Sequence, residues 1–162
     1  MFLGVTDLPS YFAYGSNMSS ARLLARVPGA TTQGAARLVD WRLRFDKPSR
    51  DGSTKANVAP EVGSVVWGVV WSLPAHGWSL LDGFEPGYDR IPCQISAASG
   101  RISTAQLYAF RGPTGDGLPF DWYLAHLMEG AREHALPVDY LEGLRAIAVR
   151  ADAPRRGSRS GR

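Results

Sequence analysis

Two short segments of this chain carry the residues best suited to chemistry. In the first, Tyr11–Met18, an aromatic, strand-like run ends in Gly-Ser-Asn, and a helix-start pattern follows. A strand that ends in a glycine-bearing turn before a helix directs several backbone N–H groups to one side, and the helix adds its unpaired first-turn donors. This layout indicates an anion-binding turn. A strand–turn–helix junction without a ligand gives the same local pattern.

The second segment contains Glu85, which lies between Phe84 and Pro86-Gly87 after a helix pattern over residues 75–81. An apolar neighbour disfavours the charged form of a carboxylate and raises its pKa, which suits a group that exchanges protons near neutral pH. An exposed acidic residue at a helix end has the same sequence context. Asp82 is a competing carboxylate, although its position fits a turn or a helix end better.

The segment Tyr11–Met18 resembles the signature loop of the γ-glutamylcyclotransferase-like family, whose members bind the γ-glutamyl group of a substrate and convert it to 5-oxoproline. Further segments resemble that family in the same order, and the similarity extends over about residues 10–148. These segments are Val66–Trp71, Leu81–Glu85, Tyr88–Arg90, Gly130–Glu133 and Leu136–Tyr140. The last two are similar to the closing helices of the family's enzymes of glutathione metabolism.

The resemblance implies a site and a reaction. Glu85 is then the general base of an intramolecular acyl transfer, in which the substrate's α-amine attacks its own γ-carbonyl and the distal amine leaves. Backbone N–H groups of the loop contact the oxyanion or the carboxylate, with Gly15 allowing the substrate to approach. The implied substrate-binding residues are Tyr11, Phe12, Ala13, Tyr14, Gly15, Ser16, Asn17 and Tyr123.

Four positions near this site are open to more than one interpretation. On the residue pattern alone, Tyr123 is equally a helix tyrosine that packs against its neighbours. Tyr108 and Arg90 are candidates for the pocket lining, and Arg90 is also placed to pair with a nearby acid. The chain departs from the family's usual Glu-Gly pattern where Pro86 follows the glutamate, because proline removes a backbone donor. Activity is weakened if the family uses that donor.

Three functions fit these segments. The first is a γ-glutamylcyclotransferase acting on a γ-glutamyl amino acid or a γ-glutamyl amine. The second uses the same chemistry to remove a γ-glutamyl protecting group in a biosynthetic pathway. The third is a non-catalytic module of the same fold that binds a small anion with the loop. Glu85 and the loop together favour catalysis, because a binding module has no need of a carboxylate beside an oxyanion site.

The composition is that of one domain. The chain has 162 residues, of which 44% are hydrophobic and 20% charged, enough for one core and short for two. Much of the net charge of +3 lies in a Pro/Gly/Ser/Arg-rich end, so we divide the chain into a domain at 1–150 and a disordered basic tail at 151–162. The rest carries no stripe of basic and aromatic residues, which predicts no specific nucleic-acid partner.

Cysteine and histidine usage predicts neither a disulfide nor a metal. The single cysteine, Cys93, lies on an alternating apolar run and is expected to be buried. The three histidines are scattered without ligand spacing, so we expect no metal and no cofactor. No signal peptide or membrane-length apolar run is found, which predicts a cytoplasmic location and no membrane partner. The resemblance implies a small γ-glutamyl substrate, and we expect a monomer or a homodimer.

The elements that position these residues follow from periodicity. Alternation from Val39 to Phe45 predicts a half-buried strand, and the apolar run at 65–73 predicts a central strand with a close neighbour at Gly68. We also expect strands at 90–96 and 104–110, a polar loop at 48–56, and helices at 20–26 (capped by Ser19 or Ser20), 121–135 and 138–147. This order predicts an α+β fold, a small mixed β-barrel with peripheral helices, which the resemblance also implies.

Overall fold

The computed structural model describes residues 8–152. Its elements, in chain order, are β1 (Ser10–Ala13), the 3-10 turn η1 (Ser16–Met18), α1 (Ser20–Arg26), β2 (Thr31–Pro48), β3 (Thr54–Ser72), α2 (Gly77–Phe84), β4 (Asp89–Ala97), β5 (Ile102–Ala109), α3 (Asp121–Glu133) and α4 (Val138–Arg145). The tail expected at 151–162 lies outside the described residues except for Ala151 and Asp152, and the Asp152 carboxylate accepts a hydrogen bond from Trp122 Nε1 at 2.8 Å.

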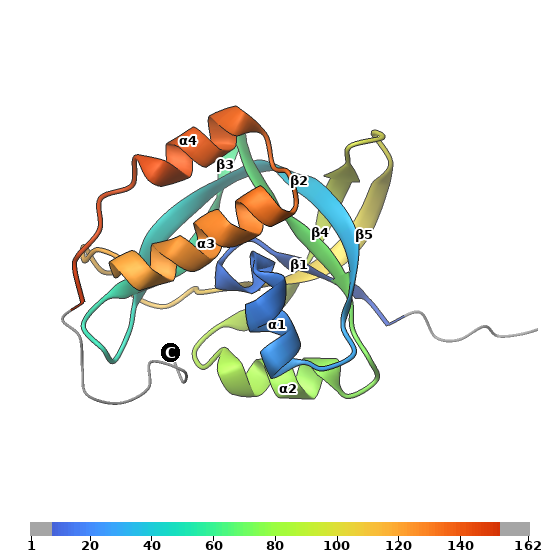
Figure 1. Ribbon diagram of the computed structural model, residues 1–162, viewed down its shortest axis with the longest axis horizontal. Helices are drawn as coiled ribbons and strands as arrows, with labels where there is room; N and C mark the ends of the chain where they lie inside the picture. The colour runs from blue at the N-terminus through green and yellow to red at the C-terminus, as the bar shows by residue number, and fades with distance from the viewer. Residues whose placement is uncertain (1–7, 153–162) are drawn as a thin grey trace, which may run out of the picture.

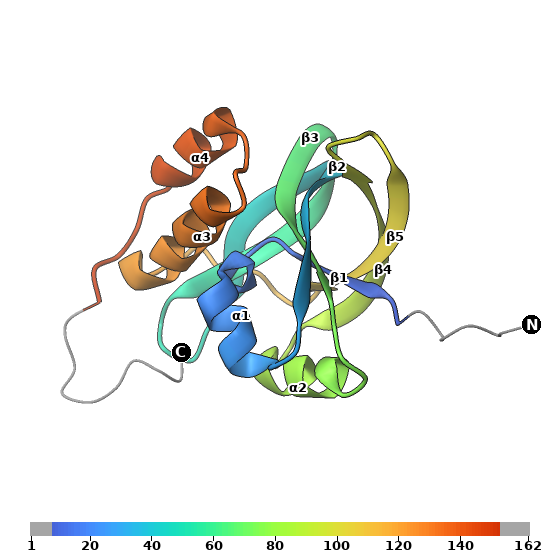
Figure 2. The ribbon, with the colours of Figure 1, turned by 45° about the vertical axis from the view of Figure 1, so that its right-hand side comes forward.

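The five strands close into a barrel in the order β1-β3-β2-β4-β5. The β1–β5 pair is parallel and the other neighbouring pairs are antiparallel. Helices α3 and α4 lie together along one side of the barrel, while α1 and α2 lie near one of its ends (Figures 1 and 2). The expected small mixed β-barrel with peripheral helices is therefore confirmed.

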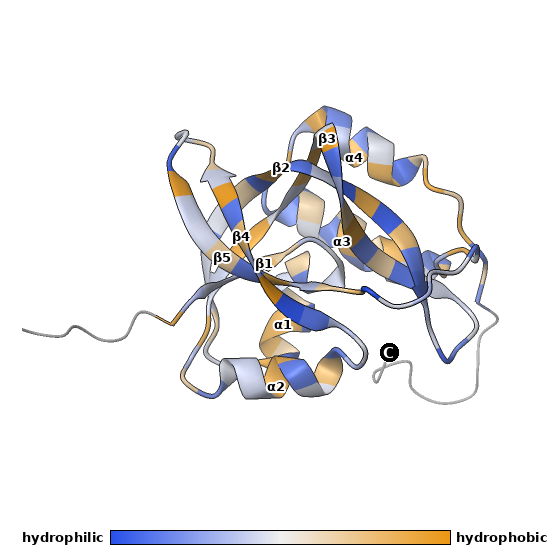
Figure 3. Cartoon of the chain, turned by 180° about the vertical axis from the view of Figure 1, so that it is seen from behind, coloured by the Kyte–Doolittle hydropathy of each residue, from blue (hydrophilic) through white to orange (hydrophobic). Residues whose placement is uncertain are grey.

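The strands β2 and β3 are much longer than their hydrophobic patterns predict. They pair from Thr31↔Ser72 to Pro48↔Thr54, so the polar loop expected at 48–56 is reduced to residues 49–53. A register shift beside Asp40, which has a φ of +66°, interrupts the alternation. Val39 consequently faces outward and is 47% exposed. Bands of hydrophilic and hydrophobic residues succeed one another along the two strands (Figure 3).

Gly68 allows β1 to approach β3 closely, as the sequence predicts. A Cβ atom at this position would lie 2.4 Å from the carbonyl oxygen of Ala13 and 2.7 Å from the Phe12 ring. Any side chain at position 68 would therefore push β1, the strand that leads into the signature loop, away from β3. Cys93 is buried, also as expected.

Helix α1 begins and ends where local signals place it. The Ser19 side chain accepts a hydrogen bond from the backbone N–H of Arg22 and caps the helix, and Pro28-Gly29 follows its last turn. Among residues 8–152, no helix has the length and apolar character needed to cross a membrane.

Candidate active site

A cavity of about 400 Å³ opens where the signature loop, the end of α2 and the β2–β3 hairpin meet. Its walls include most of the residues that the sequence assigns to the site. These are Tyr11, Tyr14, Gly15, Ser16, Asn17, Glu85 and Tyr123. Residues from β1, η1, α2 and α3 thus converge on one space, although they are far apart in the chain.

Phe12 and Ala13, two of the expected substrate-binding residues, do not line this cavity. Phe12 is fully buried and Ala13 is 1% exposed. Both pack at the place where Gly68 admits β1 against β3. These contacts hold β1 against β3 at the start of the loop.

Glu85 is positioned by a tight turn at the end of α2. Its carbonyl oxygen accepts a hydrogen bond from the Tyr88 N–H at 3.2 Å, and Gly87 has a φ of +84°. Proline at the second position and a left-handed glycine at the third are the pattern of a type II turn. Pro86 therefore favours this turn, and the turn's own hydrogen bond does not need the N–H that proline lacks.

The Glu85 carboxylate faces the signature loop and α1. Its Oε1 atom accepts a hydrogen bond from Asn17 Nδ2 at 3.2 Å and lies 3.7 Å from Arg26 Nη1. The side chain is 16% exposed. Burial raises the pKa of Glu85 from 4.5 to about 7, while the nearby Arg26 charge acts in the opposite direction. At neutral pH this carboxylate can therefore both accept and release a proton.

Asn17 connects the loop to the carboxylate. Its Nδ2 donates to the Tyr11 hydroxyl at 3.1 Å as well as to Glu85, and its Oδ1 accepts from Arg26 at 3.5 Å. Because an ionised carboxylate can only accept hydrogen bonds, these contacts fix the orientation of the Asn17 amide. Asn17 is 3% exposed, so the whole arrangement is held in a packed environment.

The loop also supplies free backbone donors. In η1 the Met18 and Ser19 N–H groups bond to Gly15 and Ser16 carbonyl oxygens. Within residues 8–152, the N–H groups of Ser16 and Asn17 donate to no protein acceptor. First-turn donors of this kind are available to an anion or to a developing oxyanion.

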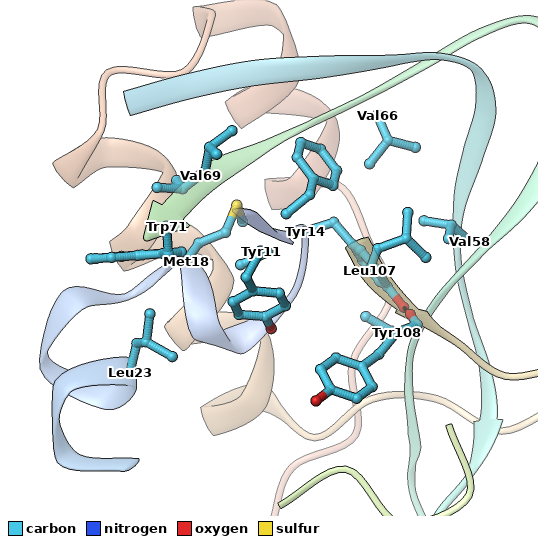
Figure 4. Close-up of a cluster of buried hydrophobic side chains, with 14 of the residues drawn as sticks. Tyr11, Tyr14, Met18, Leu23, Val58, Val66, Val69, Trp71, Leu107 and Tyr108 are labelled. Atoms are coloured by element: carbon cyan, nitrogen blue, oxygen red, sulfur yellow. Dashed lines mark hydrogen bonds between the residues drawn. The ribbon is translucent and has the colours of Figure 1, made fainter. Parts of the chain in front are cut away.

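Tyrosines form much of the remaining wall, and the backbone of Ala56 in β3 holds two of them. The Tyr123 hydroxyl accepts from the Ala56 N–H at 3.0 Å, and the Tyr88 hydroxyl donates to the Ala56 carbonyl oxygen at 2.7 Å. The Tyr14 hydroxyl donates to the Tyr108 carbonyl oxygen. Figure 4 shows the Tyr11 and Tyr108 hydroxyls at the edge of the buried cluster, pointing away from Val66. The cavity therefore has rigid aromatic walls.

Asp82, the competing carboxylate, is committed elsewhere. It accepts a hydrogen bond from the Tyr108 hydroxyl at 2.8 Å and pairs with Arg90 at 3.1 Å. Neither Asp82 nor Arg90 lines the cavity, whereas Tyr108 does. Arg90 also lies over the Trp78 ring. Of the two carboxylates considered from the sequence, only Glu85 reaches the cavity.

Several cavity residues were not identified from the sequence as site residues. Among them are Arg22, Arg26, Lys47 and Tyr88. The two arginines are four positions apart on the helix that follows the loop, and this spacing was an available signal because it places both on one helix face. Residues 8–152 contain no group of three or more His, Cys, Asp and Glu side chains arranged to hold a metal ion.

Replacing Glu85 with glutamine should relieve a pH-dependent loss of stability. Because the pKa of Glu85 rises from 4.5 to about 7 on folding, the folded protein holds a proton that the unfolded chain releases in this interval. The stabilising contribution is thus complete below pH 4.5 and is lost as the pH rises through 7. Relative to the parent, Glu85→Gln should gain about 3 kcal/mol in free energy of unfolding between pH 4.5 and pH 8, measured by urea denaturation.

Glu61→Gln provides a control of opposite sign. A hydrogen bond from Ser64 lowers the pKa of Glu61, so its stabilising contribution is present at neutral pH and is lost on acidification. That variant should lose stability relative to the parent as the pH rises. A pH-independent difference between the parent and Glu85→Gln would contradict the raised pKa.

The chain is similar to known proteins over most of its length. A family model described as the AIG2-like family matches residues 65–144. The γ-glutamylcyclotransferase of Bos taurus is 33% identical over 146 residues, which cover 85% of this chain and 77% of that protein. The Homo sapiens γ-glutamylcyclotransferase is 32% identical with the same coverage. A solved γ-glutamyl cyclotransferase structure has a TM-score of 0.86 at 29% identity, covering 94% of this chain and 95% of that one.

The chain belongs to the γ-glutamylcyclotransferase family. The resemblance seen in the sequence is thereby confirmed, and the similarity extends over nearly the whole described barrel and its helices.

Proposed function

We propose that this protein is a γ-glutamylcyclotransferase that converts a γ-glutamyl amino acid or γ-glutamyl amine to 5-oxoproline and the free amine. The observation that carries the proposal is the Glu85 carboxylate, which lines the cavity with a pKa of about 7 and contacts Asn17 of the signature loop. Relatives named γ-glutamylcyclotransferase at about one-third identity support it.

The reaction is an intramolecular acyl transfer, in which one C–N bond forms and another breaks. The substrate's α-amine nitrogen forms a bond to its own γ-carbonyl carbon, and the amide bond to the leaving amine breaks. Glu85 in its carboxylate form accepts the proton from the attacking nitrogen and then gives it to the leaving amine, so the enzyme returns to its starting state. Nucleophile and electrophile belong to one molecule, and the cavity therefore needs chiefly to hold the folded conformer.

The loop would stabilise the charge that develops during this exchange. The free N–H groups of Ser16 and Asn17 are donors fixed by η1, and fixed donors stabilise an oxyanion without reorganising during the reaction. Tyr88 and Tyr123, both held by Ala56, would limit the conformers that the substrate can adopt.

Release of 5-oxoproline from a panel of γ-glutamyl compounds tests the proposal. The panel contains γ-glutamyl amino acids, γ-glutamyl alkylamines and, as a control, α-glutamyl dipeptides, whose free amine and scissile carbonyl cannot close the same five-membered ring. We expect 5-oxoproline from γ-glutamyl compounds only, and their relative rates define the leaving amine. Binding of these compounds without release of 5-oxoproline would instead identify a non-catalytic module.

The pH dependence of kcat/KM should report Glu85. Only its ionised form can accept a proton, so kcat/KM should rise with pH through an apparent pKa near 7. Arg26→Gln should move this rise to higher pH, because Arg26 is the nearest charge that favours the ionised form. Arg42→Gln, on an exposed side chain paired with Glu61, should leave it in place. An unshifted profile in Arg26→Gln would contradict the assignment.

Two further expectations stay predictions from the sequence. They are the cytoplasmic location and the monomeric or homodimeric state. The tail from residue 153 onward also stays a prediction, since it lies outside the described residues.

A further inference from the structure

Two arginines on α1 face the cavity in different states. Arg26 is engaged by the protein: it lies 3.7 Å from Glu85, donates to Asn17 and covers the Phe84 ring. The side chain of Arg22, one helical turn earlier, makes a single hydrogen bond, from its Nε to the Ser16 hydroxyl at 3.0 Å. Among the described residues, no carboxylate forms an ion pair with Arg22, and its two terminal nitrogens have no hydrogen-bond acceptor.

The position of Arg22 is unfavourable for a cation without a counter-ion. Burial, followed by repulsion from Arg26, lowers the pKa of Arg22 to about 10. Buried or partly buried charges are ordinarily paired. Removing a charge from water costs free energy, and only an opposite charge or hydrogen bonds offset that cost. An arginine in this state, lining a cavity, is suited to bind an anion that enters from solvent.

We propose that Arg22 binds the α-carboxylate of the γ-glutamyl substrate, while Arg26 holds Glu85. This inference rests on the proposed cyclotransferase function. The guanidinium would use its two terminal nitrogens in a bidentate pair, the geometry in which arginine binds carboxylates best. The hydrogen bond from its Nε to Ser16 would fix the orientation of the guanidinium plane relative to the loop.

Chemical connectivity selects the α-carboxylate over the carboxylate of a leaving amino acid. The α-amine must reach Glu85, which contacts Asn17. The α-carboxylate is attached to the same carbon as that amine, so it must lie close to the same part of the loop. Arg22 is held there by Ser16, the neighbour of Asn17. The leaving group lies at the other end of the γ-glutamyl chain.

Binding of the product isolates this contact, because 5-oxoproline keeps the α-carboxylate and has lost the leaving amine. We would measure dissociation constants of 5-oxoproline and of its carboxamide by calorimetry, or by competition with a γ-glutamyl substrate. The parent should prefer the acid to the amide by about 10- to 100-fold, the range of a charge-assisted hydrogen-bonded pair. Arg22→Gln should bind both equally weakly, and Arg42→Gln should keep the parental preference.

Each other result overturns the assignment. If Arg22→Gln weakens the acid and the amide by the same factor, Arg22 only supports the loop through Ser16. If Arg22→Gln keeps the acid preference with both affinities at the parental level, another group binds the carboxylate. If Arg22→Gln does not fold, Arg22→Lys replaces it. Lysine keeps the positive charge but lacks the two terminal guanidinium nitrogens, so this variant should show a reduced preference for the acid over the amide. A full parental preference would exclude the bidentate pair.

The outcome is separable from that of the proposed function. Release of 5-oxoproline by a parent enzyme whose acid preference does not depend on Arg22 would leave the function standing and remove the subsite. A parent that neither releases nor binds 5-oxoproline would remove both.

Discussion

Glu85→Gln should reduce turnover of a γ-glutamyl substrate by about 10²- to 10⁴-fold, the usual contribution of general acid–base catalysis. The amide keeps the shape of the side chain but cannot accept the proton of the attacking amine. Substrate binding should change little, because the loop and Arg22 stay in place. Single-turnover release of 5-oxoproline, together with a binding measurement, separates the two effects.

Asp82→Asn is the matched control, since it also replaces a carboxylate with an amide on the same segment. Asp82 binds Tyr108 and Arg90 outside the cavity, so this variant should keep most of the turnover. Turnover of Glu85→Gln at the parental rate would show that the base has been misassigned. Loss of turnover in Asp82→Asn alone would transfer the role to Asp82.

Gly130→Ala should destabilise the protein and impair the site together, although Gly130 does not itself line the cavity. Helix α3 crosses η1 so closely that a Cβ at Gly130 would lie 2.5 Å from the backbone carbon of Met18 and 2.7 Å from the Ser19 nitrogen. Backbone atoms cannot rotate away as a flexible side chain can. We expect a loss of about 1–3 kcal/mol or more, which lowers the Tm by several degrees.

The activity loss in Gly130→Ala follows from the same displacement. Met18 is next to Asn17, whose amide contacts Glu85, so a shift of η1 moves the donors and the base relative to each other. A misplacement of about 1 Å can cost as much as 100-fold in rate. Both Tm and kcat/KM should be measured, the latter well below the Tm of the variant.

Gly143→Ala is the corresponding control on α4. A Cβ at Gly143 meets nothing within 4 Å, and alanine is the better helix former by about 1 kcal/mol. This variant should be as stable as the parent or slightly more stable, with unchanged activity. Equal behaviour of the two glycine variants would contradict the close packing of α3 on η1.

Several features follow from the sequence alone because they depend on neighbours along the chain. Helix α1 begins after the Ser19 cap and ends before Pro28-Gly29, at the predicted positions. Strands β4 and β5 lie where alternation predicts them. The signature loop and Glu85 were identified from the order of residues within short segments, and family membership confirms the resemblance that those segments carry.

Other features were decided by barrel closure, because they depend on pairing between distant segments. The residues around Lys55 are polar and predict a loop, yet pairing with β2 makes them a strand. The tight contact of β1 with β3 turns Phe12 into a core residue, although it belongs to the signature loop.

The assignment of charges within the site required the tertiary structure above all. Glu85 contacts Asn17, which is 68 positions earlier in the sequence, and also pairs with Arg26. Asp82 instead pairs with Arg90, outside the cavity. From the sequence the two arginines of α1 are equivalent, since each is a basic residue on one helix face. Only the placement of the loop and of the α2 turn beside that helix leaves Arg22 without a carboxylate partner among the described residues, because ion pairing depends on distances that residue order does not contain.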